Sequence, residues 1–169
     1  DGDLDGWAAD VHAADRELRS RSGAQSTVWI GMRLGAAVAL RAAQQAPEPL
    51  ARLLLWDPVL DGARYLRHLR QRHVASLEEA FSLMPVPSPA ELARDPTRFC
   101  DEAIGFALAP RLREQLAGLR PSGHRWPTRP RSIVVIGEPD GDDAADLSAA
   151  CKREPARVQT VAVRHGIDW

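Results

Sequence analysis

The sequence holds an arginine between two glycines, in Gly31-Met32-Arg33-Leu34-Gly35, and this residue has the chemistry to bind an anion. Its guanidinium presents donors in a fork that matches a carboxylate or a phosphate, and the N–H groups of the following turn would add to such a site. A guanidinium is not deprotonated in proteins, so Arg33 cannot attack a carbonyl as a nucleophile. The alternative is a structural ion pair between Arg33 and Asp57 or Asp140.

Two further residues, Asp140 and His165, have the chemistry of an acid and a base, and each follows an apolar run. A carboxylate beside a histidine orients the ring and stabilises its charged form, and histidine titrates near neutral pH, as a general base must. Asp57, which follows an earlier apolar run, is an alternative acid. Each residue also has an ordinary interpretation, because aspartates are common in turns and a histidine beside a strand end is often solvated.

Short apolar runs place these residues at the ends of predicted strands. Continuous apolar runs are typical of parallel strands that are covered on both faces. Stretches of helical periodicity alternate with these runs, and this alternation indicates an α/β fold with a parallel sheet. The predicted strands are Ser26–Ile30, Arg52–Trp56, Ser132–Ile136 and Arg157–Val163, and the helices expected around them cover about 6–21, 34–45 and 142–153.

A stretch of about 75 residues without strand signals separates the second and third predicted strands. We expect a single domain, 1–169, with a helical cap or insert over about 62–130. The insert is predicted to contain helices at Asp61–Leu77, Asp95–Phe106 and Pro110–Leu119, and a turn at Ala90–Ala93. The first of these helices carries several arginines, which predict a solvated basic face or, alternatively, a surface for an acidic ligand or partner: Arg64, Arg67, Arg70 and Arg72.

The composition limits the classes of partner. The 22 Lys and Arg nearly cancel the 23 Asp and Glu, so no bulk charge attracts the protein to nucleic acid or to an anionic membrane. No apolar stretch is long enough to span a bilayer, and no leader pattern is expected. Cys100 and Cys151 lack metal-ligand spacing, which fits buried thiols in the cytoplasm. We predict a cytoplasmic protein with no metal and no cofactor.

The order of these landmarks resembles the carboxyl-terminal part of an α/β-hydrolase. In that fold a Gly-x-Ser-x-Gly turn joins a strand to a helix, and here Arg33 stands where the serine would be. The sequence is also similar to bacterial hydrolases associated with exosortase systems, which are relatives of serine aminopeptidase-like hydrolases. Three segments carry this similarity: Gly31–Ala36, Leu54–Gly62 and Asp101–Phe106.

The resemblance implies a three-layer α/β-hydrolase-type parallel sheet and assigns residues to its active site. It makes Asp140 the acid, with Asp57 as the alternative, His165 the base, and the backbone N–H of Leu34 part of an oxyanion hole. It also implies an eight-stranded sheet of which this chain supplies about the last four strands, so a fragment of a longer hydrolase is one interpretation of the chain. A sheet cut in this way would have an open edge, through which copies could associate.

Two functions from different classes follow. The first is a hydrolase of ester, thioester or amide bonds in a small-molecule or acyl substrate, in which Asp140 and His165 act with a water or another nucleophile. The second is a catalytically inactive hydrolase relative that binds an acidic ligand or a protein partner. Arg33 argues against serine chemistry and leaves both hypotheses open.

Overall fold

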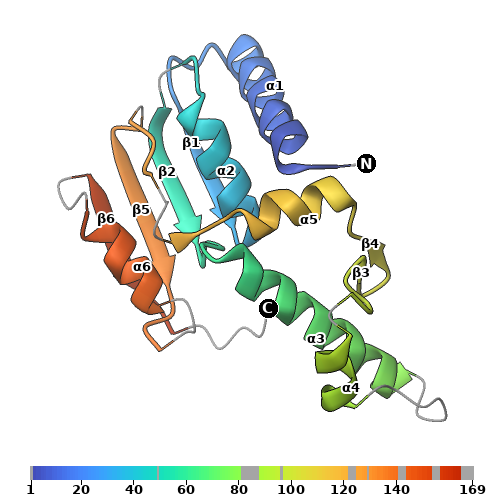
Figure 1. Ribbon diagram of the computed structural model, residues 1–169. Helices are drawn as coiled ribbons and strands as arrows, with labels where there is room; N and C mark the ends of the chain where they lie inside the picture. The colour runs from blue at the N-terminus through green and yellow to red at the C-terminus, as the bar shows by residue number, and fades with distance from the viewer. Residues whose placement is uncertain are drawn as a thin grey trace. The chain divides into compact units, whose positions relative to one another are not determined.

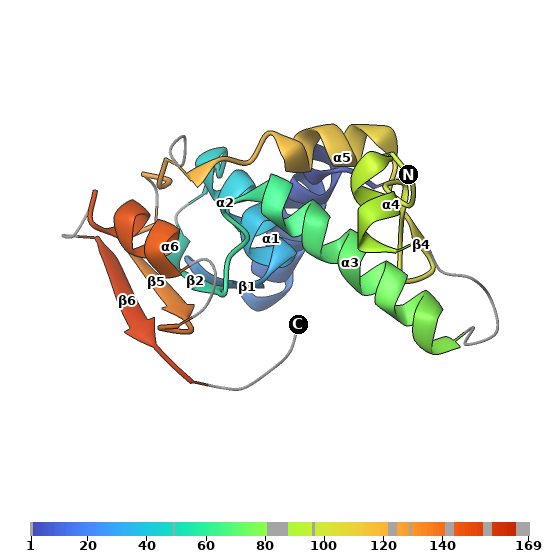
Figure 2. The ribbon, with the colours of Figure 1, turned by 60° about the horizontal axis from the view of Figure 1, so that its bottom comes forward.

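We describe the protein from a computed structural model of residues 1–169 (Figures 1 and 2). The structure describes residues 2–48, 50–80, 88–95, 97–121, 125–128, 130–140, 144–153 and 157–164. The chain divides into two compact units. We call residues 4–60 and 120–169 the sheet unit, and residues 1–3 and 61–119 the helical unit.

The sheet unit holds a four-stranded sheet in which every strand pair is parallel (Figure 1). The spatial order of the strands is β1-β2-β5-β6. An α/β fold with a parallel sheet was predicted from the sequence, and the structure confirms it. The strands are β1 (Thr27–Met32), β2 (Leu50–Trp56), β5 (Ser132–Gly137) and β6 (Val158–Ala162), and the helices of this unit are α1 (Leu4–Ser22), α2 (Leu34–Gln44) and α6 (Ala144–Cys151).

One face of this sheet, which we call the inner face, carries the core. Its side chains pack with the alanine-rich side of α2 and with Ala150 and Cys151 of α6 in one buried cluster. Small residues on α2 allow the helix to lie close to the strands, so large strand residues fill the space between them. The inner face consists of Thr27, Trp29 and Gly31 of β1, Leu50, Leu53 and Leu55 of β2, Ile133, Val135 and Gly137 of β5, and Val158, Thr160 and Ala162 of β6.

The opposite face of the same strands, which we call the outer face, follows from the register. Alternate residues of a strand point to opposite faces of a sheet, so the neighbours of each inner residue belong to the outer face. None of these outer residues is buried. They are Val28, Ile30 and Met32 of β1, Arg52, Leu54 and Trp56 of β2, Ser132, Val134 and Ile136 of β5, and Gln159 and Val161 of β6.

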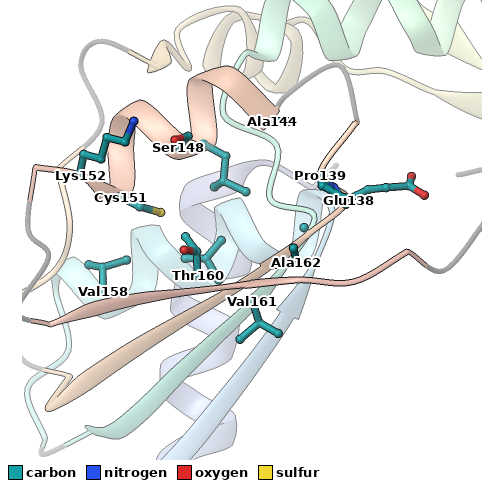
Figure 3. Close-up of a pocket in the computed structure, with 13 residues that line it drawn as sticks. Glu138, Pro139, Ala144, Ser148, Cys151, Lys152, Val158, Thr160, Val161 and Ala162 are labelled. Atoms are coloured by element: carbon teal, nitrogen blue, oxygen red, sulfur yellow. The ribbon is translucent and has the colours of Figure 1, made fainter.

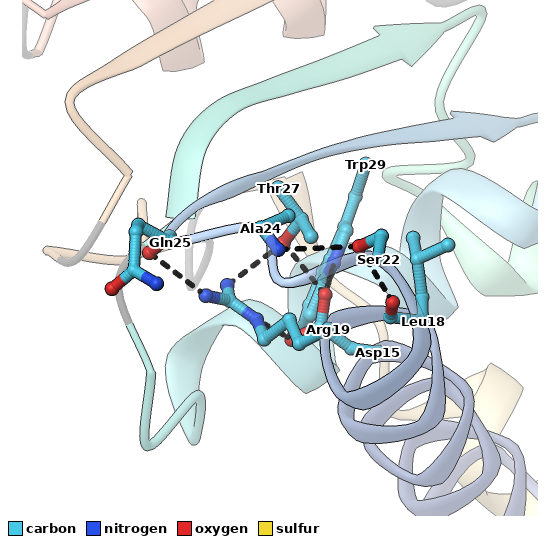
Figure 4. A network of polar contacts seen from close by, with 8 residues as sticks. All are labelled: Asp15, Leu18, Arg19, Ser22, Ala24, Gln25, Thr27 and Trp29. Atoms are coloured by element: carbon cyan, nitrogen blue, oxygen red, sulfur yellow. Dashed lines mark hydrogen bonds and ion pairs between the residues drawn. The ribbon is translucent and has the colours of Figure 1, made fainter.

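A buried carboxylate attaches α1 to β1 (Figure 4). Asp15 accepts hydrogen bonds from Thr27 Oγ1 at 2.6 Å, from Trp29 Nε1 at 3.0 Å and from Arg19 Nε at 2.7 Å. Burial by itself would raise the pKa of Asp15, but these three donors and the charge of Arg19 hold that pKa below its ordinary value of 3.8. The long helix α1 is therefore fixed to the inner face by an ionised side chain.

The helical unit differs in part from its prediction. It contains α3 (Gly62–Ala80), α4 (Pro89–Arg94), a hairpin of β3 (Glu102–Ala103) and β4 (Phe106–Ala107), and α5 (Pro110–Ala117). The first and third predicted helices are confirmed as α3 and α5. The predicted turn at 90–93 is wrong, because Ser88 and Glu91 form a capping box that starts the helix α4. Whether this unit acts as a cap stays a prediction.

The helix predicted at 95–106 is also wrong. The carboxylate of Asp95 accepts hydrogen bonds from the backbone N–H groups of Thr97 and Arg98, which stabilises a local turn instead of a helix. Ile104 and Gly105 then both have positive φ, at 50° and 83°, as a two-residue hairpin turn requires. A motif of aspartate followed by proline was therefore not sufficient to predict a helix start.

Arg70 shows that part of the basic side of α3 is structural. Its guanidinium donates to the backbone oxygens of Leu92, Asp95 and Arg98. Arg64 lies 3.9 Å from Asp61 at the start of the same helix. Arg70 therefore attaches α3 to the segment 92–98, and Arg64 contacts the start of its own helix. Both contacts weaken the alternative of a surface for an acidic partner.

Candidate functional site

The turn between β1 and α2 holds Arg33 in a strained backbone conformation. Arg33 has φ 49° and ψ −120°, a region that side-chain-bearing residues rarely adopt. Backbone hydrogen bonds fix this conformation, since the N–H of Arg33 donates to Trp56 O at 2.9 Å and its carbonyl accepts from Ala36 at 3.0 Å and Val59 at 3.4 Å. Neighbouring backbone thus holds the apex of the turn in place.

Only the first of the two bracketing glycines is required by packing. A Cβ on Gly31 would lie 2.6 Å from both the Cα of Ala36 and the backbone oxygen of Gly35. A Cβ on Gly35 would meet nothing within 4 Å. The tight passage from β1 to α2 therefore depends on Gly31, which lets the start of the helix approach the end of the strand.

The side chain of Arg33 is half-buried and makes no hydrogen bond or ion pair with the residues that the structure describes. An ion pair with Asp57 or Asp140 was one sequence interpretation, and none is present in the described ranges. The amides of Leu34 and Gly35 follow directly at the start of α2, where backbone N–H groups have no acceptor within the helix. The guanidinium and the positive end of α2 therefore lie next to each other in the chain.

Asp57, the alternative acid, occupies a strained turn of its own after β2. Its φ is 42°, and its backbone N–H donates to Ile136 O at 2.8 Å. Its Oδ1 accepts a hydrogen bond from the N–H of Glu138 at 3.2 Å. Asp57 therefore connects the ends of β2 and β5, which agrees with the ordinary interpretation of this residue as a turn former.

Asp140, the acid that the resemblance implies, lies on the surface. Its carboxylate accepts a hydrogen bond from Arg164 at 2.9 Å, and the two side chains are 75% and 77% exposed. Sequence reasoning missed Arg164, although this arginine directly precedes His165. The candidate base His165 lies outside the described residues, so the pairing of Asp140 with His165 stays a prediction.

A cavity of about 410 Å³ lies between α6 and the strands β5 and β6 (Figure 3). Val135 and Val158 contribute apolar walls. Ser148 stands on α6, Lys152 directly follows this helix, and Thr160 faces them from β6. Burial raises the pKa of the Cys151 thiol in its wall to about 11, so this thiol stays protonated at neutral pH. None of Arg33, Asp57 and Asp140 lines the cavity.

Comparison with known proteins gives a structural result and no sequence result. No protein-family model and no curated protein matches the chain. Solved structures do match: an E-2-(acetamidomethylene)succinate hydrolase has a TM-score of 0.57 at 17% identity, with 95% of this chain and 65% of that one covered. A lipase in its open form has a TM-score of 0.56 at 17% identity over 95% and 64% of the two chains. A structure from the work on carboxylesterases of Nitrososphaera gargenis has a TM-score of 0.54 at 18% identity over 95% and 64%.

The chain has an α/β-hydrolase-type fold. At these identities the likeness shows the fold alone, and the chain spans less than two thirds of the length of the structures just named. The assignment of the β1–α2 turn to the nucleophile position of hydrolases stays a prediction from the sequence resemblance. Arg33, Asp57 and Asp140 all follow the carboxyl ends of parallel strands, so they belong to the same edge of the sheet where α/β proteins bind ligands.

The described residues include neither a metal site nor a membrane span. In that part of the chain no group of three or more His, Cys, Asp or Glu side chains could hold a metal ion. Nor does any described helix have the length and apolar character needed to cross a bilayer.

Proposed function

We propose that this protein is an α/β-hydrolase-fold protein that binds an anionic group, a carboxylate or a phosphate, at the β1–α2 turn. The observation that carries the proposal is the guanidinium of Arg33. It stands at the apex of a strained turn and has no partner among the described side chains. Strained backbone persists where the surroundings over-determine it, and such positions cluster at functional sites.

The donors around Arg33 suit an anion. Arg33 offers a planar fork for two parallel hydrogen bonds, and the amides of Leu34 and Gly35 add donors at the positive end of α2. The fold presents this turn at the carboxyl edge of the sheet. An anionic oxygen of a bound molecule would therefore lie against both the guanidinium and the start of the helix. The backbone N–H of Leu34, which the resemblance assigns to an oxyanion hole, would donate to this bound anion.

Hydrolysis is the second candidate, because the named structural neighbours are hydrolases and an esterase-related structure. Asp140 follows β5 and His165 comes after β6, in the chain order of acid then base. A water or another nucleophile would have to replace the serine, since Arg33 cannot be deprotonated. An ester, thioester or amide substrate, the exosortase association, bacterial origin and a cytoplasmic location remain predictions from sequence.

Anion binding is tested by titrating the protein with inorganic phosphate and with acetate while backbone amide signals are followed by NMR. We expect the largest shifts at Leu34 and Gly35. The variant Arg33→Met should weaken phosphate binding about tenfold or more, which corresponds to the loss of roughly 1.4 kcal/mol. Arg33→Lys should recover only part of the affinity, because an ammonium lacks the planar fork.

Arg16→Met is the matched control, because Arg16 is an exposed arginine on α1. Its phosphate affinity should equal that of the unmodified protein. Equal binding by the Arg33→Met variant, or shifts confined to other amides, would contradict the proposal.

Hydrolysis is tested separately with a fluorophosphonate probe and a panel of p-nitrophenyl esters. Ester turnover that disappears in His165→Ala would support the second candidate and reject an inactive relative. Absence of turnover, both in the unmodified protein and in Arg33→Ser, would remove the main support of the hydrolase hypothesis.

A further inference from the structure

The two cysteines of the chain have different surroundings. Cys151 is buried in the wall of the cavity beside α6, and burial raises the pKa of its thiol to about 11. Cys100, which lies just before β3 in the helical unit, is only half-buried. The sequence interpretation of two buried thiols therefore holds for Cys151 alone. A partly exposed thiol can meet small reagents in solution, so the contacts of Cys100 bear on its reactivity.

A guanidinium contacts the sulfur of Cys100. Arg113 lies on α5, and its Nη1 donates a hydrogen bond to Cys100 Sγ at an N···S distance of 2.9 Å. A hydrogen bond from a charged donor is stronger than a neutral one when the accepting atom carries negative charge. The thiolate is the nucleophilic form of cysteine, and reactive cysteines occur in electropositive, partly exposed surroundings of this kind.

The same guanidinium has a second donor that is not used. Arg113 Nε is buried and has no hydrogen-bond partner among the residues that the structure describes. Buried donors are nearly always paired, so an orphaned one calls for an acceptor from outside these residues. A thiol sulfur is itself only a weak acceptor. An oxygen atom attached to the sulfur of Cys100 would lie next to this guanidinium and would give it a stronger acceptor.

Local contacts hold the segment before β3, so that the sulfur stays beside Arg113. The backbone N–H of Cys100 donates to Thr97 O at 3.2 Å. The ring of Phe99 packs edge-on against the buried ring of His73, with 5.4 Å between the ring centroids. All of these residues belong to the helical unit. The pair of Cys100 and Arg113 is therefore complete within one compact unit.

We propose that Cys100 is a site of oxidation by hydrogen peroxide, and that Arg113 stabilises the attacking thiolate and the oxidised product. The sulfur attacks one peroxide oxygen, so that an S–O bond forms as the O–O bond breaks. Two electrons pass from the sulfur to the leaving oxygen, which departs as hydroxide and takes the proton that the thiol gave up, forming water. The oxidised sulfur becomes a sulfenic acid.

The half-buried position of Cys100 favours this oxidant, because hydrogen peroxide is small enough to reach a sulfur that a bulky reagent would not. The proposal does not depend on the anion site at Arg33, since the two arginines belong to different units of the chain.

The test compares Cys100 in the folded protein with the same residue in the chain unfolded by urea. Both samples are treated with hydrogen peroxide, the sulfenic acid is trapped with dimedone, and each cysteine is quantified by peptide mass spectrometry. Cys100 should oxidise several-fold faster in the folded protein, because the thiol of the unfolded chain is fully accessible but has no guanidinium fixed beside it. Cys151 is the internal control and should react only in urea, since it is buried.

Variants of Arg113 test the role of the guanidinium. Arg113→Met should lower the rate of Cys100 oxidation in the folded protein about tenfold. Arg113→Lys should keep part of the rate, because the positive charge remains while the planar fork is lost. Arg67→Met is the matched control, because Arg67 is an exposed arginine on α3 of the same unit and its loss should leave the rate unchanged.

Two results would overturn the proposal. The first is a Cys100 that oxidises no faster in the folded protein than in urea, and this comparison does not require any variant to fold. The second is a folded Arg113→Met variant that keeps the rate of the unmodified protein, because Cys100 would then react through exposure alone.

Discussion

The two faces of the sheet are built from the same four strands and have opposite surroundings. On β2, Leu53 and Leu55 are fully buried on the inner face, whereas Leu54 between them is half-buried on the outer face. On β1, Gly31 is buried and its neighbour Ile30 is 68% exposed. The difference lies in what covers each face, because both carry apolar side chains.

This contrast separates the tendency of an apolar run to form a strand from the burial of that strand in a core. The inner face shows how a helix with small side chains converts apolar strand residues into a core. The outer face shows that an equally apolar set of residues remains accessible when no described helix of the sheet unit lies over it. An apolar run therefore predicts a strand, and the packing of other elements decides which side of that strand stabilises the fold.

The largest effect on the free energy of unfolding is expected when an inner-face side chain is truncated, compared with truncation of an outer-face side chain. Leu55→Ala should lower the free energy of unfolding by about 3 kcal/mol, because it leaves a cavity beneath α2. Ile30→Ala should change it by less than about 1 kcal/mol in dilute solution, because most of that side chain is in water. Urea denaturation of both variants measures the difference. Equal losses would mean that the outer face is covered within the monomer.

The sequence predicted the sheet because local features were sufficient for it. Continuous apolar runs ended at Asp57 and at Gly137-Glu138-Pro139, and these positions are the ends of β2 and β5. The turn at Arg33 was also predictable, since Gly31 is needed there for packing. What the sequence could not show was the coverage of each face, because periodicity does not identify the neighbours of a strand.

The candidate site was predictable in position and not in its contacts. Arg33, Asp57 and Asp140 do follow the strands that the apolar runs indicated. The ion pair of Asp140 with Arg164 depends on the register of β5 and β6, which no local motif encodes. The helix predicted at 95–106 failed for a related reason, since side-chain hydrogen bonds of Asp95 compete with helix formation.

A smaller effect on the free energy of unfolding is expected from substitutions at the two glycines of the Arg33 turn. Gly31→Ala should lower the free energy of unfolding by about 2 kcal/mol, because its Cβ would overlap the backbone of α2 on the inner face. Gly35→Ala should be neutral or stabilising by up to about 1 kcal/mol, because its Cβ meets open space and alanine favours helix. Thermal and urea denaturation of the pair check this. A loss of stability in Gly35→Ala as large as that in Gly31→Ala would show that the turn tolerates no side chain at either position.

The smallest effect is expected at Asp15, whose hydrogen bonds hold α1 on the inner face. Asp15→Asn should cost about 1.5 kcal/mol at neutral pH, because the amide keeps one acceptor for Thr27 and Trp29 and loses the charge opposite Arg19. The pKa of Asp15 is lower in the folded protein than its ordinary 3.8, so the stabilisation is complete above that value and is lost as the pH falls through the folded pKa. The stabilities of the two proteins should therefore converge at acid pH, whereas Glu17→Gln, which changes an exposed pair with Arg21, should follow the unmodified protein throughout. A difference between Asp15→Asn and the unmodified protein that does not shrink below pH 3.8 would mean that shape, and not charge, makes Asp15 hold α1 against the inner face.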